Sequence, residues 1–165
     1  MNKAVFLDRD GVINELVKGQ EMHSFILTKE SCLPIPGAKE ALRKIRDKGY
    51  LRIVVTNQPA IARGLVSPEE VDSLHQFLND KLDNLIDRFY TCPHHPEMHP
   101  DVPEHAKKYR IPCDCRKPGS GMLFRAAQDF DIDLKKSFMI GDMITDIAAG
   151  AGAGCQTMMI ESPAN

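Results

Sequence analysis

Two aspartates separated by one residue follow the first apolar segment of the chain. Asp8 and Asp10 come directly after residues 4–7, four apolar residues that are typical of a buried strand. If the chain stays extended, alternate side chains share a face, so both carboxylates can approach one reactant. Two like charges this close repel each other unless a cation lies between them. Such oxygen ligands suit Mg²⁺, and Asp142 is the expected third carboxylate.

The same residue types could carry phosphoryl transfer. A carboxylate can accept a phosphoryl group as an aspartyl phosphate, provided that Mg²⁺ and nearby cations neutralise the moving charge. Lys117 is the expected cation, and Thr56 is an expected hydrogen-bond donor to the phosphate. Asp10 is expected to protonate the leaving alcohol and later to deprotonate the attacking water. The predicted reaction is therefore the hydrolysis of a phosphate monoester.

A second group of metal-binding residue types brackets residues 92–115, a segment with five prolines and no clear periodicity. The four expected ligands are Cys92, His94, Cys113 and Cys115. Three thiolates and one imidazole form a closed tetrahedral set that is typical of structural zinc. His95 is the main alternative to His94, and His99 and His105 are weaker ones. Because a loop of this length without regular structure is unusual, we expect zinc to hold its shape. Zinc would also fix Arg116 and Lys117, which follow directly.

Strands and helices alternate along the chain, which predicts an α/β fold with a Rossmann-like parallel sheet covered by helices on both faces. The predicted strands are residues 4–7, 51–55, 88–91, 137–140 and 156–160, and helices are predicted near residues 38–48, from Ser67, at 121–130 and from Thr145. In such a sheet the ligand site lies beyond the carboxyl ends of the strands. The polar residues that follow three of the predicted strands should therefore gather at one edge.

Length and composition fit one domain over residues 1–165, without room for a large inserted cap domain. The chain is 42% hydrophobic and 27% charged, with a net charge of -2, so we expect no nucleic-acid or membrane partner. No apolar stretch approaches a membrane span, and no signal peptide is recognisable. We expect a cytoplasmic monomer. Cys32 and Cys155 stand apart from the other three cysteines and are expected to be packed thiols.

Four segments carry a resemblance to a known family. Residues 6–14, 55–58, 116–118 and 140–146 resemble, in order, the four motifs of the haloacid-dehalogenase-like phosphatases. The resemblance implies that Asp8 is the nucleophile and Asp10 the general acid and base. It implies that Thr56 and Lys117 hold the phosphate. It also implies that Asp142 and the backbone carbonyl of Asp10 complete the Mg²⁺ site.

Within that family, residues 56–64, 92–96 and 113–118 resemble the heptose-bisphosphate phosphatases, with the histidinol-phosphate phosphatases as a sister group. The first group implies the same four zinc ligands. It also implies a small phosphorylated sugar as substrate, cleaved at its 7-phosphate on the route to nucleotide-activated heptose and lipopolysaccharide. The expected substrate contacts are Asn57, Gln58, Arg63 and Arg116. The chain departs from this group at Pro59-Ala60, at residues 15–19 and at Met143.

Two other classes of protein share part of this pattern. A phosphoacceptor switch domain of the receiver type also has an aspartate pair, a threonine and a lysine after successive strands. The segment 92–115 and Asp142 argue against it. An inactive zinc-bearing binding module is a second alternative, weakened because no expected catalytic position is missing.

Overall fold

The computed structural model describes residues 1–16, 25–96 and 101–161. Two parts of the sequence that drew attention fall partly or wholly outside these ranges. They are residues 15–19, where the chain departs from the heptose-bisphosphate phosphatases, and the histidine at position 99, within the segment 92–115.

The core of the fold is a five-stranded sheet in the order β3-β2-β1-β4-β5, in which every neighbouring pair is parallel. The strands are β1 (Ala4–Leu7), β2 (Leu51–Asn57), β3 (Arg88–Cys92), β4 (Phe138–Gly141) and β5 (Gln156–Met159). All four residues of β1 are buried, as expected for the central strand of a sheet that is covered on both faces. The predicted parallel α/β fold is confirmed.

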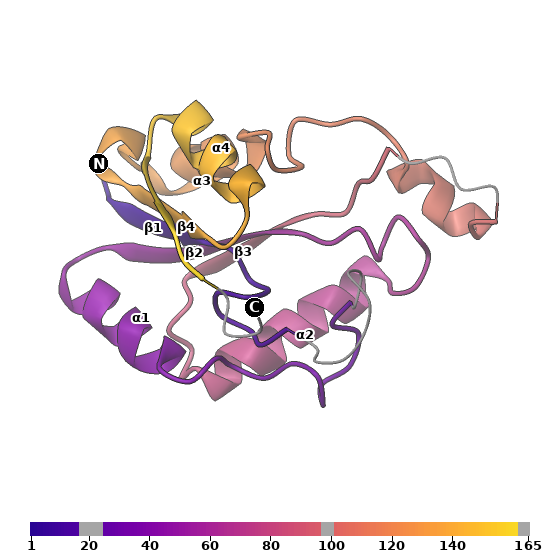
Figure 1. Cartoon of the computed structure of the whole chain (residues 1–165), viewed down its shortest axis with the longest axis horizontal. Coiled ribbons are helices and arrows are strands. Elements are labelled where there is room, and N and C mark those ends of the chain that lie inside the picture. The colour runs from indigo at the N-terminus through magenta and orange to yellow at the C-terminus, as the bar shows by residue number, and fades with distance from the viewer. Residues whose placement is uncertain (17–24, 97–100, 162–165) are drawn as a thin grey trace.

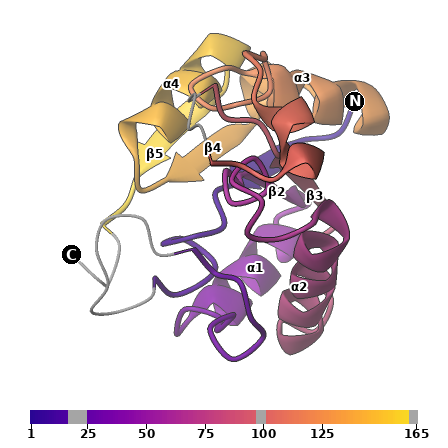
Figure 2. The same cartoon turned by 90° about the vertical axis from the view of Figure 1, so that its right-hand side faces the viewer.

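Helices cover the two faces of the sheet in pairs (Figures 1 and 2). The helices are α1 (Ala38–Asp47) and α2 (Pro68–Lys81) on one face, and α3 (Gly121–Phe130) and α4 (Ile144–Ala153) on the other. Side chains along the strands alternate between the two cores, because a strand has a period of two residues. Val5, Leu7 and Val54 pack with α1 and α2, whereas Phe6 and Ile53 pack with α3.

Helix α2 begins where the sequence predicts it. The hydroxyl of Ser67 accepts from the backbone N–H of Glu70, and the carboxylate of Glu70 accepts from the N–H of Ser67. This capping box, with Pro68 at the first helical position, satisfies N–H groups that have no partner inside the helix. The segment between β2 and β3 contains α2 and no other helix or strand, so no cap domain is inserted there.

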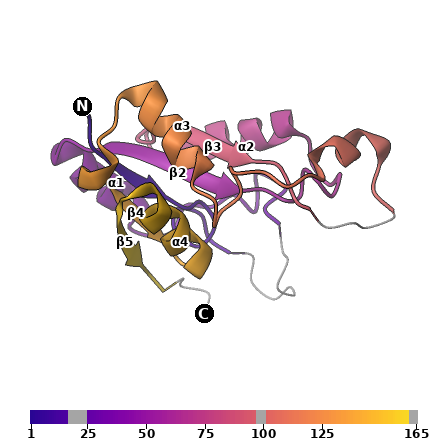
Figure 3. The ribbon, with the colours of Figure 1, turned by 90° about the horizontal axis from the view of Figure 1, so that it is seen from above.

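Two differences from the sequence-based prediction concern the carboxyl edge of the sheet. Strand β2 continues two residues further than predicted, because Thr56 and Asn57 pair with Thr91 and Cys92 of β3. The segment 92–115 is also partly regular: residues Glu104–Tyr109 form a 3₁₀ helix, η1, which lies beyond the carboxyl ends of β2 and β3 (Figure 3). A second 3₁₀ helix, η2 (Leu134–Lys136), precedes β4. No helix in the described ranges is long and apolar enough to cross a membrane.

Candidate active site

Three aspartates meet at the carboxyl ends of the two central strands. Asp8 follows β1, and Asp142 and Asp146 follow β4; one carboxylate oxygen from each lies within 4.8 Å of the others. Gly141 permits this approach, because a Cβ at that position would overlap the side chain of Asp146. Oδ1 of Asp142 is buried and has no hydrogen-bond partner in the described part of the chain. Three converging carboxylates, one of which has a buried oxygen without a partner, fit a hard cation such as Mg²⁺.

Lys117 is the cation of this site. Its side chain is 2% exposed, and Nζ donates to Oδ1 of Asp8 at 2.8 Å, to Oδ1 of Asp146 at 2.6 Å and to the carbonyl of Val55 at 2.8 Å. Burial lowers the pKa of Lys117, but the two carboxylates outweigh it and raise the pKa above its ordinary value. The lysine therefore stays charged.

The surroundings of Asp8 favour the neutral form of its carboxyl group. Burial, together with the negative charges of Asp146 and Asp10, raises the pKa of Asp8 to about 7 despite the opposing effect of Lys117. Burial raises the pKa of Asp142 as well. A divalent cation among these carboxylates would favour their ionised forms, which is the form that a nucleophilic carboxylate needs.

The carboxylate of Asp10 is not a member of the three-aspartate group. It accepts from Nε and Nη2 of Arg9 at 2.9 and 3.0 Å, and from Nε2 of Gln58 at 3.1 Å. The spacing of the two aspartates suggested that both carboxylates face one cation. In the structure the third carboxylate of the group belongs to Asp146, in the first turn of α4, which also accepts from Nζ of Lys117.

The polar residues at the end of β2 hold the site together. Asn57 forms two hydrogen bonds with the backbone of Lys117, from Nδ2 to the carbonyl and from the N–H to Oδ1, each 3.0 Å long. Gln58 is buried and donates to Oγ1 of Thr56 at 2.8 Å as well as to Asp10. The hydroxyl hydrogen of Thr56 remains available to a phosphate. The amides of Asn57 and Gln58 bind neighbouring residues of the site, and their expected contact with substrate stays a prediction.

The two arginines expected to contact substrate lie on different segments. Arg116 directly precedes Lys117 and donates from Nη1 to the carbonyl of His94 at 3.3 Å. The guanidinium of Arg63 lies over the ring of Phe25, with 5.2 Å between Cζ and the ring centroid. Arg116 therefore contacts the cysteine and histidine group twice: it follows Cys115 along the chain, and its side chain binds the backbone of His94.

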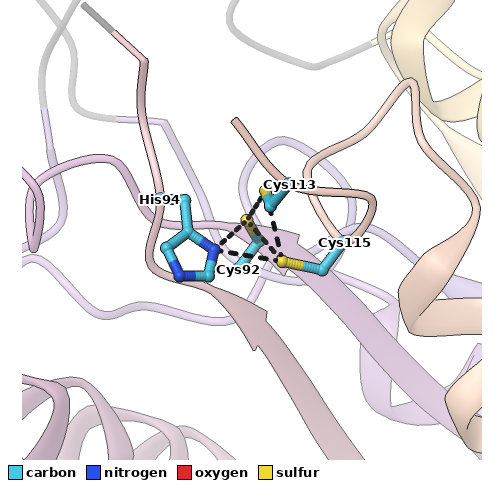
Figure 4. Close-up of side chains that lie close together, drawn as sticks. All are labelled: Cys92, His94, Cys113 and Cys115. Atoms are coloured by element: carbon cyan, nitrogen blue, oxygen red, sulfur yellow. Dashed lines mark hydrogen bonds between the residues drawn. The ribbon is translucent and has the colours of Figure 1, made fainter. Parts of the chain in front are cut away.

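The four expected zinc ligands converge (Figure 4). Sγ of Cys115 lies 3.0 Å from Sγ of Cys92, 3.4 Å from Sγ of Cys113 and 3.3 Å from Nδ1 of His94. Burial raises the pKa of the Cys92 and Cys115 thiols, so these sulfurs are thiols unless a cation binds them. His95 points its backbone N–H to the carbonyl of Tyr109 and is not in the group. The donor set fits a tetrahedral zinc ion.

The two remaining cysteines are buried apart from this group, as expected: Cys32 in the core below α1 and α2, and Cys155 in the core below α3 and α4. Two polar residues that the sequence analysis did not single out also belong to the site. They are Arg9 and His75, both buried and in contact with each other. Its place between the two aspartates of the expected site was a usable signal for Arg9. Nothing in the helical pattern of α2 distinguished His75.

Residues 114–163 match the family model described as HAD-hydrolase-like. This segment contains α3, β4 and α4, and with them Asp142 and Asp146. Relatives that align with nearly the whole chain are named phosphatases, and a phosphatase is the class that this fold and site define.

A D-glycero-beta-D-manno-heptose-1,7-bisphosphate 7-phosphatase of Haemophilus ducreyi is 38% identical over 162 residues, covering 96% of this chain and 82% of the relative. The enzyme of the same name from Salmonella typhi is 36% identical and covers 95% of this chain and 79% of the relative. D,D-heptose 1.7-bisphosphate phosphatase from B. bronchiseptica, solved with magnesium and phosphate, aligns with a TM-score of 0.77 and 29% identity over 95% of this chain and 79% of that one. The chain belongs to the HAD-like hydrolase family, where these heptose-bisphosphate phosphatases are its relatives.

Proposed function

We propose that this phosphatase removes the 7-phosphate of D-glycero-D-manno-heptose 1,7-bisphosphate, with Asp8 as the nucleophile. One observation carries the mechanism: the buried Lys117 donates a hydrogen bond to Asp8 at the carboxyl end of the central strand, β1. The pKa of Asp8 is raised there. The names of relatives that cover nearly the whole chain support the substrate. Histidinol phosphate, the substrate of the sister group, is the competing substrate.

In the first step an oxygen of Asp8 attacks phosphorus while the bond between phosphorus and the sugar oxygen breaks. Asp10 gives its proton to the leaving oxygen. Lys117 and the hydroxyl of Thr56 bind the phosphoryl oxygens as charge moves between them. In the second step a water oxygen attacks phosphorus, the bond to Asp8 breaks, and Asp10 takes a proton from that water. Both aspartates are thereby restored.

The proposed ligands of Mg²⁺ are the carboxylates of Asp8 and Asp142 and the backbone carbonyl of Asp10. Asp146 lies beside them. This ion supplies charge neutralisation at the phosphoryl oxygens. A solved relative that contains magnesium and phosphate supports this assignment. The role of this chain's own residues is to align Asp8 with phosphorus and to keep Lys117 charged.

Cys92, His94, Cys113 and Cys115 are the proposed ligands of one structural zinc ion. The zinc would hold Arg116 in place, because Arg116 follows one ligand along the chain and donates to the carbonyl of another, His94. A guanidinium can bind the second phosphate of a bisphosphate, or the sugar, with two parallel hydrogen bonds. Arg63 is the weaker proposal for this role.

A comparison of substrates tests the proposal. Phosphate release is measured for both anomers of the heptose 1,7-bisphosphate, for histidinol phosphate and for p-nitrophenyl phosphate, with Asp8→Asn as the inactive control. We expect the heptose bisphosphate to give the highest kcat/KM, and Arg116→Ala to raise its KM far more than that of the aryl phosphate. Arg125→Ala, on the exposed side of α3, is the matched arginine control. Equal or better turnover of histidinol phosphate would move the protein to the sister group, and stoichiometric phosphorylation without turnover would indicate a receiver-like switch.

A further inference from the structure

Arg9 lies between Asp8 and Asp10 in the sequence, and its side chain is completely buried. All three nitrogens of its guanidinium group contact polar neighbours. Nε and Nη2 donate to the two oxygens of Asp10 at 2.9 and 3.0 Å. The third nitrogen, Nη1, lies 3.1 Å from Nε2 of His75, which is on α2, 66 residues away along the chain. The guanidinium therefore links the Asp10 carboxylate to a helix on the face of the sheet.

His75 is held as an acceptor for this arginine. It is 3% exposed, and its ring stacks on Phe89 of β3 with centroids 4.4 Å apart and planes 11° apart. Burial, and to a lesser extent the positive charge of Arg9, lower the pKa of His75 to about 3, so the ring is neutral at ordinary pH. A guanidinium can only donate, so Nε2 must accept and Nδ1 carries the hydrogen.

The carboxylate of Asp10, unlike the ring of His75, is partly exposed and is held by hydrogen bonds to its neighbours. It is 29% exposed and belongs to the turn that follows β1, where Gly11 has a φ of 84°. Two hydrogen bonds from Arg9 and one from Gln58 determine its direction. Two of the three hydrogen bonds that orient the Asp10 carboxylate therefore come from Arg9.

We propose that His75 is a positioning residue: through Arg9 it directs the carboxylate of Asp10 toward the water that hydrolyses the aspartyl phosphate. The inference deepens the proposed function and rests on it. Without the ring, Nη1 of Arg9 would be buried and unpaired, and Arg9 would turn toward another acceptor, taking Asp10 with it. A displacement of about 1 Å in a catalytic group can cost roughly 100-fold in rate.

The experiment is a rapid-quench measurement with p-nitrophenyl phosphate, on magnesium-loaded enzyme. This leaving group needs no proton, so the first step does not depend on Asp10, whereas hydrolysis of the aspartyl phosphate does. We expect His75→Leu to keep the initial burst of p-nitrophenol. Its steady-state rate should fall by about 10- to 100-fold and the phosphoenzyme should accumulate. His75→Gln, whose amide oxygen can accept from Arg9, should recover most of the rate.

The matched control is Leu78→Ala, a buried change one turn further along α2 that lowers stability without touching Arg9. If His75→Leu behaves like this control, with burst and steady-state rate lowered in proportion, the histidine is only structural and the inference is wrong. An unchanged steady-state rate would overturn it too. A wild-type enzyme that forms no phosphoenzyme and releases no phosphate would overturn the proposed function itself.

Discussion

Nζ of Lys117 donates to Oδ1 of Asp8 across 2.8 Å, although the two residues are 109 positions apart in the chain. The lysine reaches the end of β1 because the side chain of Asn57 binds both the backbone N–H and the backbone carbonyl of Lys117. A cation already placed on the nucleophile needs little rearrangement when the phosphoryl group arrives, which is how a preorganised site lowers the reaction barrier.

Replacement of this lysine tests the buried charge network. Lys117→Met leaves Asp8 and Asp146 without their shared cation, so we expect loss of turnover and, in the absence of Mg²⁺, destabilisation by about 3–5 kcal/mol. Urea denaturation at fixed pH measures the second effect. Lys136→Met is the control: that lysine is 73% exposed in its ion pair with Asp133, and its loss should cost less than about 1 kcal/mol. Equal effects of the two changes would contradict the described network.

Gly141 should be indispensable for the position of Asp146. The methyl group in Gly141→Ala would overlap the Asp146 side chain, so Asp146 must leave Lys117 and the acidic group. We expect kcat to fall by at least roughly tenfold, and measurement of steady-state kinetics as a function of Mg²⁺ should reveal a weaker response to the ion. In Gly152→Ala the new methyl group would lie 2.7 Å from the hydroxyl of Ser120, a side chain outside the acidic group, so this control should retain activity.

The cysteine and histidine group predicts metal content. Purified protein should contain about one zinc per chain, and Cys113→Ser should lose most of it together with thermal stability, because a structural site needs all four ligands. Metal analysis and a thermal melt measure both. Cys155→Ser, a buried cysteine that is not one of the four ligands, should keep its zinc. Full activity after strong chelation followed by excess Mg²⁺ would show that the zinc is dispensable.

The buried histidine predicts an acid-side loss of stability. The pKa of His75 is about 3 in the folded protein, compared with 6.5 for an ordinary histidine. As pH falls from about 6.5 toward 3, the unfolded chain binds a proton that the folded one does not, so this residue lowers stability by up to about 1.4 kcal/mol per pH unit. Urea denaturation at several pH values should show a shallower decline for His75→Gln. An identical slope in both proteins would mean that the histidine is protonated in the folded state.

Much of the site follows from the sequence because parallel strands bring their carboxyl ends to one edge. Residues such as Asp8, Thr56 and Asp142 follow separate apolar runs, and the topology alone brings them together. The pairing of two ligands at each end of the segment 92–115 likewise predicted the group that the structure places together. The assignment of residues 1–165 to one domain, and of the protein to the cytoplasm as a monomer, stays a prediction.

Contacts made by side-chain direction could not be read from the sequence. The carboxylate of Asp10 turns to Arg9 rather than to the other aspartates, because a buried guanidinium must be satisfied locally. His75 looks like any polar position of an amphipathic helix until α2 is packed against the sheet. The amides of Asn57 and Gln58 likewise bind the site rather than point out of it, since a buried amide needs partners.

Direct detection of the intermediate tests the central claim, that phosphate passes through Asp8. The enzyme is mixed with heptose bisphosphate and Mg²⁺, quenched within the first turnover and treated with borohydride, which reduces an aspartyl phosphate to homoserine. Mass spectrometry of the peptide that spans residues 4–14 should find this conversion at position 8, and none in Asp8→Asn. Turnover without any modification at position 8, or a phosphoryl group on another residue, would contradict the proposed mechanism.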